Sequence, residues 1–110
     1  MSVALFRIKN NDIYNSNASI TLSEPISSER FYLQHWEPAI REMNVKIFMD
    51  GSQFQRCDLD QVLSELERLR EWAARNLTNN DLEYMCSRIE HLQEIIPNSF
   101  LDDSTILYIF

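Results

Sequence analysis

The sequence predicts a single α+β domain, in which a largely antiparallel sheet packs against two long antiparallel helices and one short helix. Two segments, 58–75 and 82–96, carry apolar side chains three and four residues apart, the spacing of an amphipathic helix. β-Branched and aromatic runs lie near both ends of the chain, and another precedes Asp50-Gly51, a dipeptide typical of tight hairpin turns. With 110 residues, the chain has room for one domain, residues 1–110, with one core between two layers.

Two strands are expected at the start of the chain. Residues 3–8 (VALFRI) have the composition of a strand, and residues 18–22 alternate apolar and polar side chains. A polar loop at 10–17 separates them, so they are expected to pair antiparallel. Pro25 and the serines that follow it are expected to end the second strand.

The segment 30–44 has two readings. A helix could run through it, but Pro38 deep inside a helix would remove a hydrogen bond and clash with the preceding turn. We therefore expect an extended piece at 30–33 and a short helix over 34–43, which leaves Pro38 in or near the first turn. The sequence leaves open whether 30–36 is strand or helix.

A β-hairpin is expected next. Residues 45–49 read as a strand with alternate apolar side chains on one face, and Asp50-Gly51 would form the turn. Residues 52–56 would be the return strand, with Phe54 facing inward.

The stretch 58–75 (DLDQVLSELERLREWAAR) is the helix on which the rest of the chain is expected to pack. Asp58 is placed to cap its N-terminus, and Gln61, three residues on, completes a capping-box pattern. The buried stripe decides that this segment is a helix, because surface ion pairs contribute only about 0.2–0.5 kcal/mol each. The expected stripe is Leu59, Val62, Leu63, Leu66, Leu69, Trp72 and Ala73. The outer face is expected to carry the pairs Glu65/Arg68, Glu67/Arg70 and Glu71/Arg75.

The C-terminal third predicts a second long helix and a last strand. The helix over 82–96 would end at Pro97, and the short loop before it favours antiparallel packing on 58–75. Residues 105–110 (TILYIF) are apolar enough for a central strand that is covered on both faces.

The net charge of −7 is unevenly distributed, with −5 in residues 79–110 alone. An acidic surface repels nucleic acid and anionic membranes and attracts basic partners. The alternative is that the acidity serves solubility only.

The residues that could support catalysis or metal binding are few and dispersed. The two histidines and two cysteines are isolated in the sequence, and the single glycine excludes a glycine-rich phosphate loop. We therefore expect no enzyme activity, no catalytic residues, no metal and no cofactor. The first apolar run is too short for a signal peptide, which indicates a cytoplasmic protein with reduced thiols. Cys57 and Cys86 each suit a small buried position.

A binding protein is the remaining class. It would bind its partner through two kinds of residue: acids that lie outside the apolar stripes, and aromatic side chains that anchor the interface. Phe31 and Trp72 are expected in the core, whereas Tyr32 and Trp36 fit either the core or an interface. The candidate partner-binding residues are Tyr32, Trp36, Asp50, Asp58, Asp60, Glu83, Glu90, Glu94, Asp102 and Asp103.

Four segments together resemble an immunity protein of a contact-dependent growth inhibition system or a related polymorphic toxin system. They span roughly 31–110 and read FYLQHWEPAIREMNVKIFMDG, LDQVLSELERLREWA, YMCSRIEHLQEIIP and DDSTILYIF. The resemblance implies a small, acidic bacterial antitoxin that binds a cognate basic toxin domain and blocks its active site. It implies that the toxin is a nuclease, and most often an RNase, bound as a 1:1 complex with a monomeric immunity protein. Partners would include neither nucleic acid nor membrane.

The alternative function is another acidic inhibitor or adaptor, such as a phage-encoded mimic of nucleic acid that occupies a basic groove. The two share the same electrostatics and differ in partner.

Overall fold

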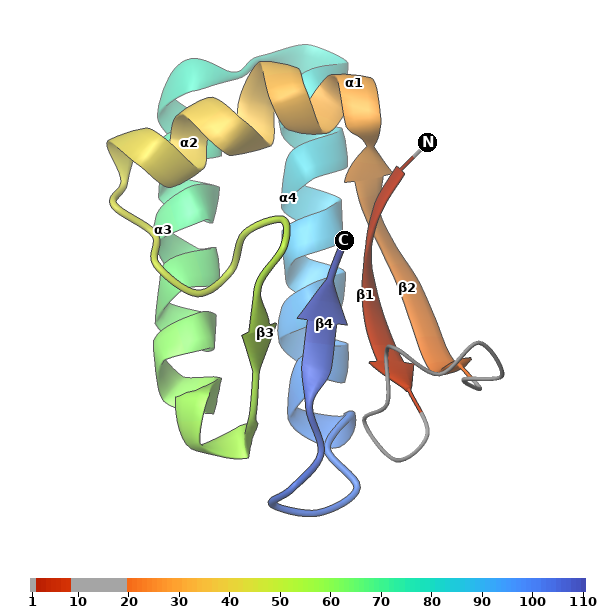
Figure 1. Cartoon of the computed structure of the whole chain (residues 1–110). Helices are drawn as coiled ribbons and strands as arrows, with labels where there is room; N and C mark the ends of the chain where they lie inside the picture. Colours follow the sequence, from red (N-terminus) through yellow and green to blue (C-terminus); the bar gives the residue numbers. More distant parts are fainter. Residues whose placement is uncertain (1, 9–19) are drawn as a thin grey trace.

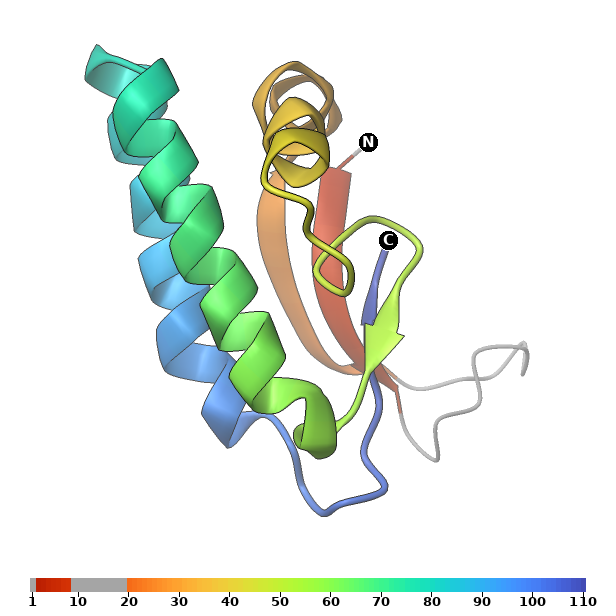
Figure 2. The same cartoon turned by 90° about the vertical axis from the view of Figure 1, so that its left-hand side faces the viewer.

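The computed structural model describes residues 2–8 and 20–110, which form a four-stranded antiparallel sheet and three helical segments. Figure 1 shows the two long helices α3 and α4 behind the sheet and a shorter helical segment across its upper end. Figure 2, turned by 90°, shows α3 and α4 as one layer and the sheet as the other, with the shorter helical segment above the strands. The strand order is β2-β1-β4-β3. The predicted fold class is therefore confirmed.

β1 (Ser2–Ile8) and β2 (Ile20–Ser28) pair antiparallel, as predicted. The prediction that Pro25 ends the second strand is wrong, because β2 continues to Ser28. β2 is an edge strand, where a proline without an N–H can be tolerated. The pairing is irregular there, since Val3 lies opposite Ser27 whereas Ala4 lies opposite Pro25. The predicted loop at 10–17 lies outside the described residues.

The chain from residue 29 to residue 42 is one continuous helical segment, made of α1 (Glu29–Phe31), a π-helical turn η2 (Tyr32–Trp36) and α2 (Glu37–Glu42). The extended piece expected at 30–33 is wrong. The N–H of Glu37 donates to the carbonyl of Tyr32, five residues back, so the helix widens just before Pro38. This turn accommodates a proline that a regular helix interior would reject.

The hairpin expected around Asp50-Gly51 does not form. Residues 45–49 are not a strand, and β3 (Gln53–Phe54) pairs with β4 instead. Gly51 has φ of +86° and the N–H of Ser52 donates to the carbonyl of Met49 at 3.1 Å. Asp50 does not share the positive φ, which a type I′ hairpin turn would require at both central residues. Phe54 is buried, as predicted.

α3 (Leu59–Asn76) buries most of the expected stripe, with Val62, Leu66 and Leu69 at its centre. Leu59 and Leu63 of that stripe are only half-buried. The expected Asp58 cap is wrong. The Asp58 carboxylate accepts the N–H of Gln55 at 3.0 Å and closes the 3₁₀ turn η3 (Arg56–Asp58) that precedes the helix.

α4 (Asn79–Ile95) packs antiparallel beside α3, as predicted, and Pro97 lies in the 3₁₀ turn η4 (Ile96–Asn98) that ends it. β4 (Leu107–Ile109) is a central strand, and all three of its residues are buried. Leu107 and Ile109 belong to the core between sheet and helices. This agrees with the doubly covered strand that its composition predicts.

Candidate protein-binding surfaces

Glu65 is fully buried, at 0% exposure, although its spacing to Arg68 predicted a position on the outer face of α3. Its carboxylate accepts the backbone N–H groups of Lys46, Ile47 and Phe48 at 2.8–3.2 Å, and the side-chain amide of Gln61 at 3.1 Å. In a strand at 45–49, these N–H groups would donate to a neighbouring strand. Here they donate to one side chain instead. The sequence carried a signal for this position, because Glu65 is three residues after Val62, within the buried stripe.

The hydrogen bonds outweigh the cost of burying this charge. Burial by itself would raise the pKa of Glu65, but the N–H groups of Phe48, Lys46 and Ile47 and the amide of Gln61 lower it below its usual value. The carboxylate is therefore ionised at neutral pH. Its bonds hold the 45–49 loop against α3, and this loop forms one wall of the groove described below.

Several arginines use their guanidinium groups to hold the protein together, and each keeps its positive charge. Their guanidinium groups donate to carbonyls far along the chain, which ties separate segments together. These contacts are Arg7 to Ser99 (2.8 Å), Arg56 to Phe100 (2.9 Å), Arg68 to Met43 (2.9 Å) and Arg88 to Pro25.

The outer surface of the α3–α4 layer, on the side away from the sheet, is acidic. On α4, Glu83, Glu90 and Glu94 are spaced seven and four residues apart, so they form one row along the exposed side of the helix. Three more exposed acids form the corresponding row on α3. We call these six residues the acidic helix face: Asp60, Glu67, Glu71, Glu83, Glu90 and Glu94.

Two contacts join the rows of the acidic helix face. Arg70 pairs with Glu90 at 2.9 Å, and the Gln93 amide donates to Glu67 at 3.1 Å. The pairs Glu67/Arg70 and Glu71/Arg75 expected within α3 are replaced by these interhelical contacts and by one from Arg75 to the Met43 sulfur at 3.4 Å. The six acids together with Arg70, which pairs with Glu90, sum to −5.

The remaining candidate acids lie elsewhere. Asp50 is exposed on the loop that follows the Glu65-bound segment, and Asp58 is half-buried in its turn before α3. Asp103 is exposed and pairs with Arg56 at 2.7 Å. Asp102 accepts the Ser104 hydroxyl at 2.6 Å, and this bond lowers the pKa of Asp102. The structure thus groups Asp60 with the α4 glutamates and separates it from Asp50.

The two aromatic candidates are both buried. Trp36 is at 0% exposure and presents no surface to a partner, and its Nε1 has no hydrogen-bond partner among the described residues. Tyr32 is buried except at its edge, where its hydroxyl accepts the N–H of Asp50 at 2.8 Å. Trp72 is in the core, as predicted, and donates to Glu42 at 2.6 Å, whereas Phe31 is only half-buried.

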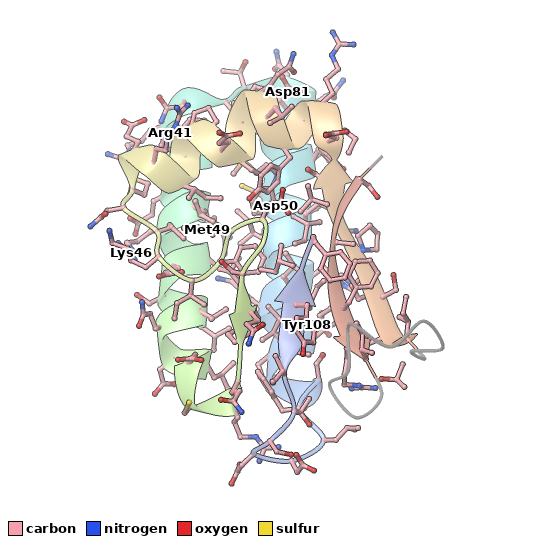
Figure 3. The ribbon with its side chains drawn as sticks, viewed as in Figure 1. Arg41, Lys46, Met49, Asp50, Asp81 and Tyr108 are labelled. Carbon is pink, nitrogen blue, oxygen red and sulfur yellow. The ribbon has the colours of Figure 1, made fainter. Side chains whose placement is uncertain are left out.

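Two adjoining cavities of about 370 and 280 Å³ form a groove beneath the 29–42 helical segment. Both are lined by Tyr32, Leu33 and Asp50. Figure 3 shows Met49 and Asp50 on the loop below this segment, with Arg41 further along α2. Neither Leu33 nor Met49 was a sequence-based candidate, because only the fold brings the loop to the helix.

The cysteines are both free. Cys86 is half-buried and packs against the core, and burial raises the pKa of its thiol. Cys57 is exposed, so the expectation of a buried position is wrong for this residue. Within residues 2–8 and 20–110, no three His, Cys, Asp or Glu side chains are arranged to hold a metal ion. No helix in the described part of the chain has the length and apolarity needed to cross a membrane.

Comparison with protein-family models, with curated proteins and with solved structures found no match to this chain.

Proposed function

We propose that this protein is an immunity protein that binds a basic toxin domain, a nuclease and specifically an RNase, and blocks its active site. The observation that carries the proposal is the acidic helix face, where six exposed carboxylates gather on one side of the molecule. Nucleases hold a phosphate backbone with Lys and Arg, so their substrate clefts complement such a face. The resemblance of 31–110 to immunity proteins supports the same partner.

The location of the charges supports a preformed interface. The six acids stand on two packed helices, joined across the seam by the contact of Arg70 with Glu90, so little ordering is needed on binding. A standard interface covers about 800 Å² of each partner. That is roughly an eighth of the 6425 Å² surface of this protein, an area that one face can provide.

The mechanism is electrostatic capture followed by occlusion. The acidic helix face steers the toxin to this side of the domain, and carboxylates take the positions that phosphates would occupy. In this proposal the protein acts in the cytoplasm as a monomer in a 1:1 complex and catalyses no reaction itself.

The first test is co-expression with the toxin domain encoded beside this chain, followed by purification and assay of nuclease activity. We expect a 1:1 complex and loss of activity at equimolar immunity protein. A toxin that neither co-purifies nor loses activity would refute the proposal. If the chain instead displaces duplex DNA from unrelated basic DNA-binding domains, the nucleic-acid mimic is the better description.

The second test locates the interface by reversing charges. Glu71→Lys, Glu83→Lys and Glu94→Lys change three acids of the acidic helix face whose carboxylates have no partner among the described residues. Association with the toxin at low salt should slow about tenfold or more in this triple variant.

A matched control is the triple variant Glu29→Lys, Glu37→Lys and Asp50→Lys, which makes the same charge change around the groove. It should slow association far less, and the difference should shrink at high salt. Equal effects of the two triple variants would mean that net charge matters and that the acidic helix face does not form the interface.

A further inference from the structure

We infer that the groove beneath the 29–42 helical segment binds an extended peptide segment of a partner protein, one that carries an apolar side chain next to Lys or Arg. The groove opens on the side of the molecule away from the acidic helix face. Figure 2 shows the 43–52 loop beginning beside α3, where Glu65 binds residues 46–48, and then turning away from α3 and α4 before it enters β3. This inference does not depend on the proposed function.

The shape of the groove suits an extended chain. Its two cavities share the walls formed by Tyr32, Leu33 and Asp50 and lie in series. One extends along α2 to Ile40 and Met49, and the other extends past the start of β1 to Phe110. Alternate side chains of an extended peptide are about 6.6–6.8 Å apart on one face, so two of them could enter the two cavities.

The groove exposes apolar surface. Leu33 is 56% exposed on the helical segment, and Phe110, whose ring stacks on Phe6, is 50% exposed at the end of the chain. They are among only four large apolar side chains in the described residues that are at least 50% exposed. Both line the groove, which favours an apolar anchor over a fully polar ligand.

The charge around the groove favours a basic segment. Three acids line it, Glu29, Glu37 and Asp50, against one base, Arg41, which gives a net charge of −2. In the described part of the chain the three carboxylates have no hydrogen-bond or ion-pair partner. They are free to pair with Lys or Arg beside the apolar anchor.

Tyr32 supplies a hydrogen-bond donor at the junction of the cavities. Its hydroxyl oxygen accepts the Asp50 N–H, and its own hydrogen has no acceptor among the described residues. Burial, opposed by this hydrogen bond, raises the pKa of Tyr32 to about 12, so the hydroxyl keeps its proton at neutral pH. It can donate to a backbone carbonyl of the peptide.

The loop wall of the groove is held in place before any ligand binds. Glu65 binds the 46–48 backbone, Tyr32 binds the Asp50 N–H, and Gly51 donates to the carbonyl of Ile109 at 2.7 Å. A wall fixed at three points needs little ordering on binding, which favours affinity.

The test is selection of random 12-residue peptides displayed on phage against the whole chain, with depletion on the double variant Leu33→Glu/Asp50→Lys. Both positions are exposed, so this variant should keep its circular dichroism spectrum. Enriched peptides should contain Leu, Ile, Met or Phe next to Lys or Arg. Once synthesised, they should bind the wild type at least tenfold more tightly than the double variant and shift the amide NMR signals of Leu33, Asp50 and Phe110.

The matched control is Leu101→Glu/Asp103→Lys, the same pair of changes at exposed positions outside both the groove and the acidic helix face, with Leu101 72% exposed. It should bind the peptides as the wild type does. If Leu33→Glu/Asp50→Lys does not fold, Leu33→Ser alone replaces it, with the same expectation of weaker binding. The inference is overturned if no peptide is enriched, if both double variants bind equally, or if the shifted amide signals lie on α3 and α4.

Discussion

At position 65 a carboxylate occupies a place where the helix spacing calls for an apolar side chain. It replaces the neighbouring strand that residues 46–48 would otherwise need, since buried N–H groups must find acceptors. The Glu65 carboxylate accepts three successive N–H groups, which must therefore point toward the same place. This explains why residues 46–48 bend rather than extend. A single residue thus sets the path of the loop that forms one wall of the groove.

Replacing Glu65 with leucine should lower the free energy of unfolding by about 3 kcal/mol or more, because three N–H groups lose their acceptor. Glu65→Gln should cost less, since its amide oxygen still accepts hydrogen bonds. Urea denaturation measures both, and Glu71→Leu, at an exposed position whose carboxylate has no partner among the described residues, should change stability by no more than about 0.5 kcal/mol. Equal losses at positions 65 and 71 would show that the Glu65 contacts do not stabilise the fold.

The same carboxylate predicts a dependence of stability on pH. Its pKa is lower in the folded protein than the value of 4.5 expected when unfolded, so on acidification the unfolded state takes up the proton first. The stabilisation by Glu65 is fully present above that value and is lost as pH falls through the folded pKa. The stability difference between wild type and Glu65→Gln should be constant near neutral pH and shrink below about pH 4.5. A difference that does not change down to pH 3 would contradict this.

At the scale of elements, two irregular turns decide how the regular ones meet. The π-helical turn at Tyr32–Trp36 lets one helical segment continue through Pro38, which places Leu33 and Glu37 along the groove. The turn at Met49–Ser52 then carries the chain from the Glu65-bound loop into β3. Both turns depend on local backbone geometry that apolar spacing does not encode.

Gly51 tests the second turn. A Cβ at this position would meet no atom within 4 Å, so only its φ of +86° opposes a side chain. Gly51→Val should therefore destabilise the protein by about 1–2 kcal/mol, whereas Gly51→Asn, which tolerates positive φ, should cost clearly less. Thermal unfolding of the two variants measures the difference. Equal costs would mean that the positive φ is not what requires glycine.

At the scale of the whole molecule, charge of one sign is concentrated on one side. The net charge is −7, and the acidic helix face with Arg70 accounts for −5 of it. Arg56 and Arg68 donate to backbone carbonyls and keep their positive charge, but the acids with which they pair, Asp103 and Glu65, lie outside the acidic helix face. Such a distribution opposes the compact state through self-repulsion and is maintained at a cost in stability.

Raising NaCl from low concentration to about 0.5 M should therefore raise the melting temperature, because salt screens the repulsion between the carboxylates. A gain of about 0.5 kcal/mol would correspond to roughly 2–4 °C in a domain of this size. Replacing Glu71, Glu83 and Glu94 with Gln should raise the melting temperature at low salt and reduce the response to NaCl. Differential scanning calorimetry measures both effects. An unchanged salt response in the triple variant would place the repulsion elsewhere.

The elements that the sequence predicted well are those whose signal is local and repeated. α3, α4, β1 and β4 each carry an apolar pattern with the period of their structure, and burial of that pattern is the main source of their stability. The antiparallel pairing of the helices followed from the shortness of the loop between them, and the central place of β4 followed from its apolar run. The same helical spacing also predicts that three of the candidate residues, Glu83, Glu90 and Glu94, share one side of α4.

Only the tertiary structure decided the rest, because it depends on groups that are distant in sequence. The 45–49 segment has the composition of a strand, yet its N–H groups bind Glu65, about eighteen residues away, so no strand forms. Asp60 joins Glu94 in one acidic face only because α3 and α4 lie antiparallel side by side. The groove exists only because Asp50 is brought to Tyr32. Spacing along a chain specifies which side chains share a face of one element, but contacts between elements specify which faces become a surface.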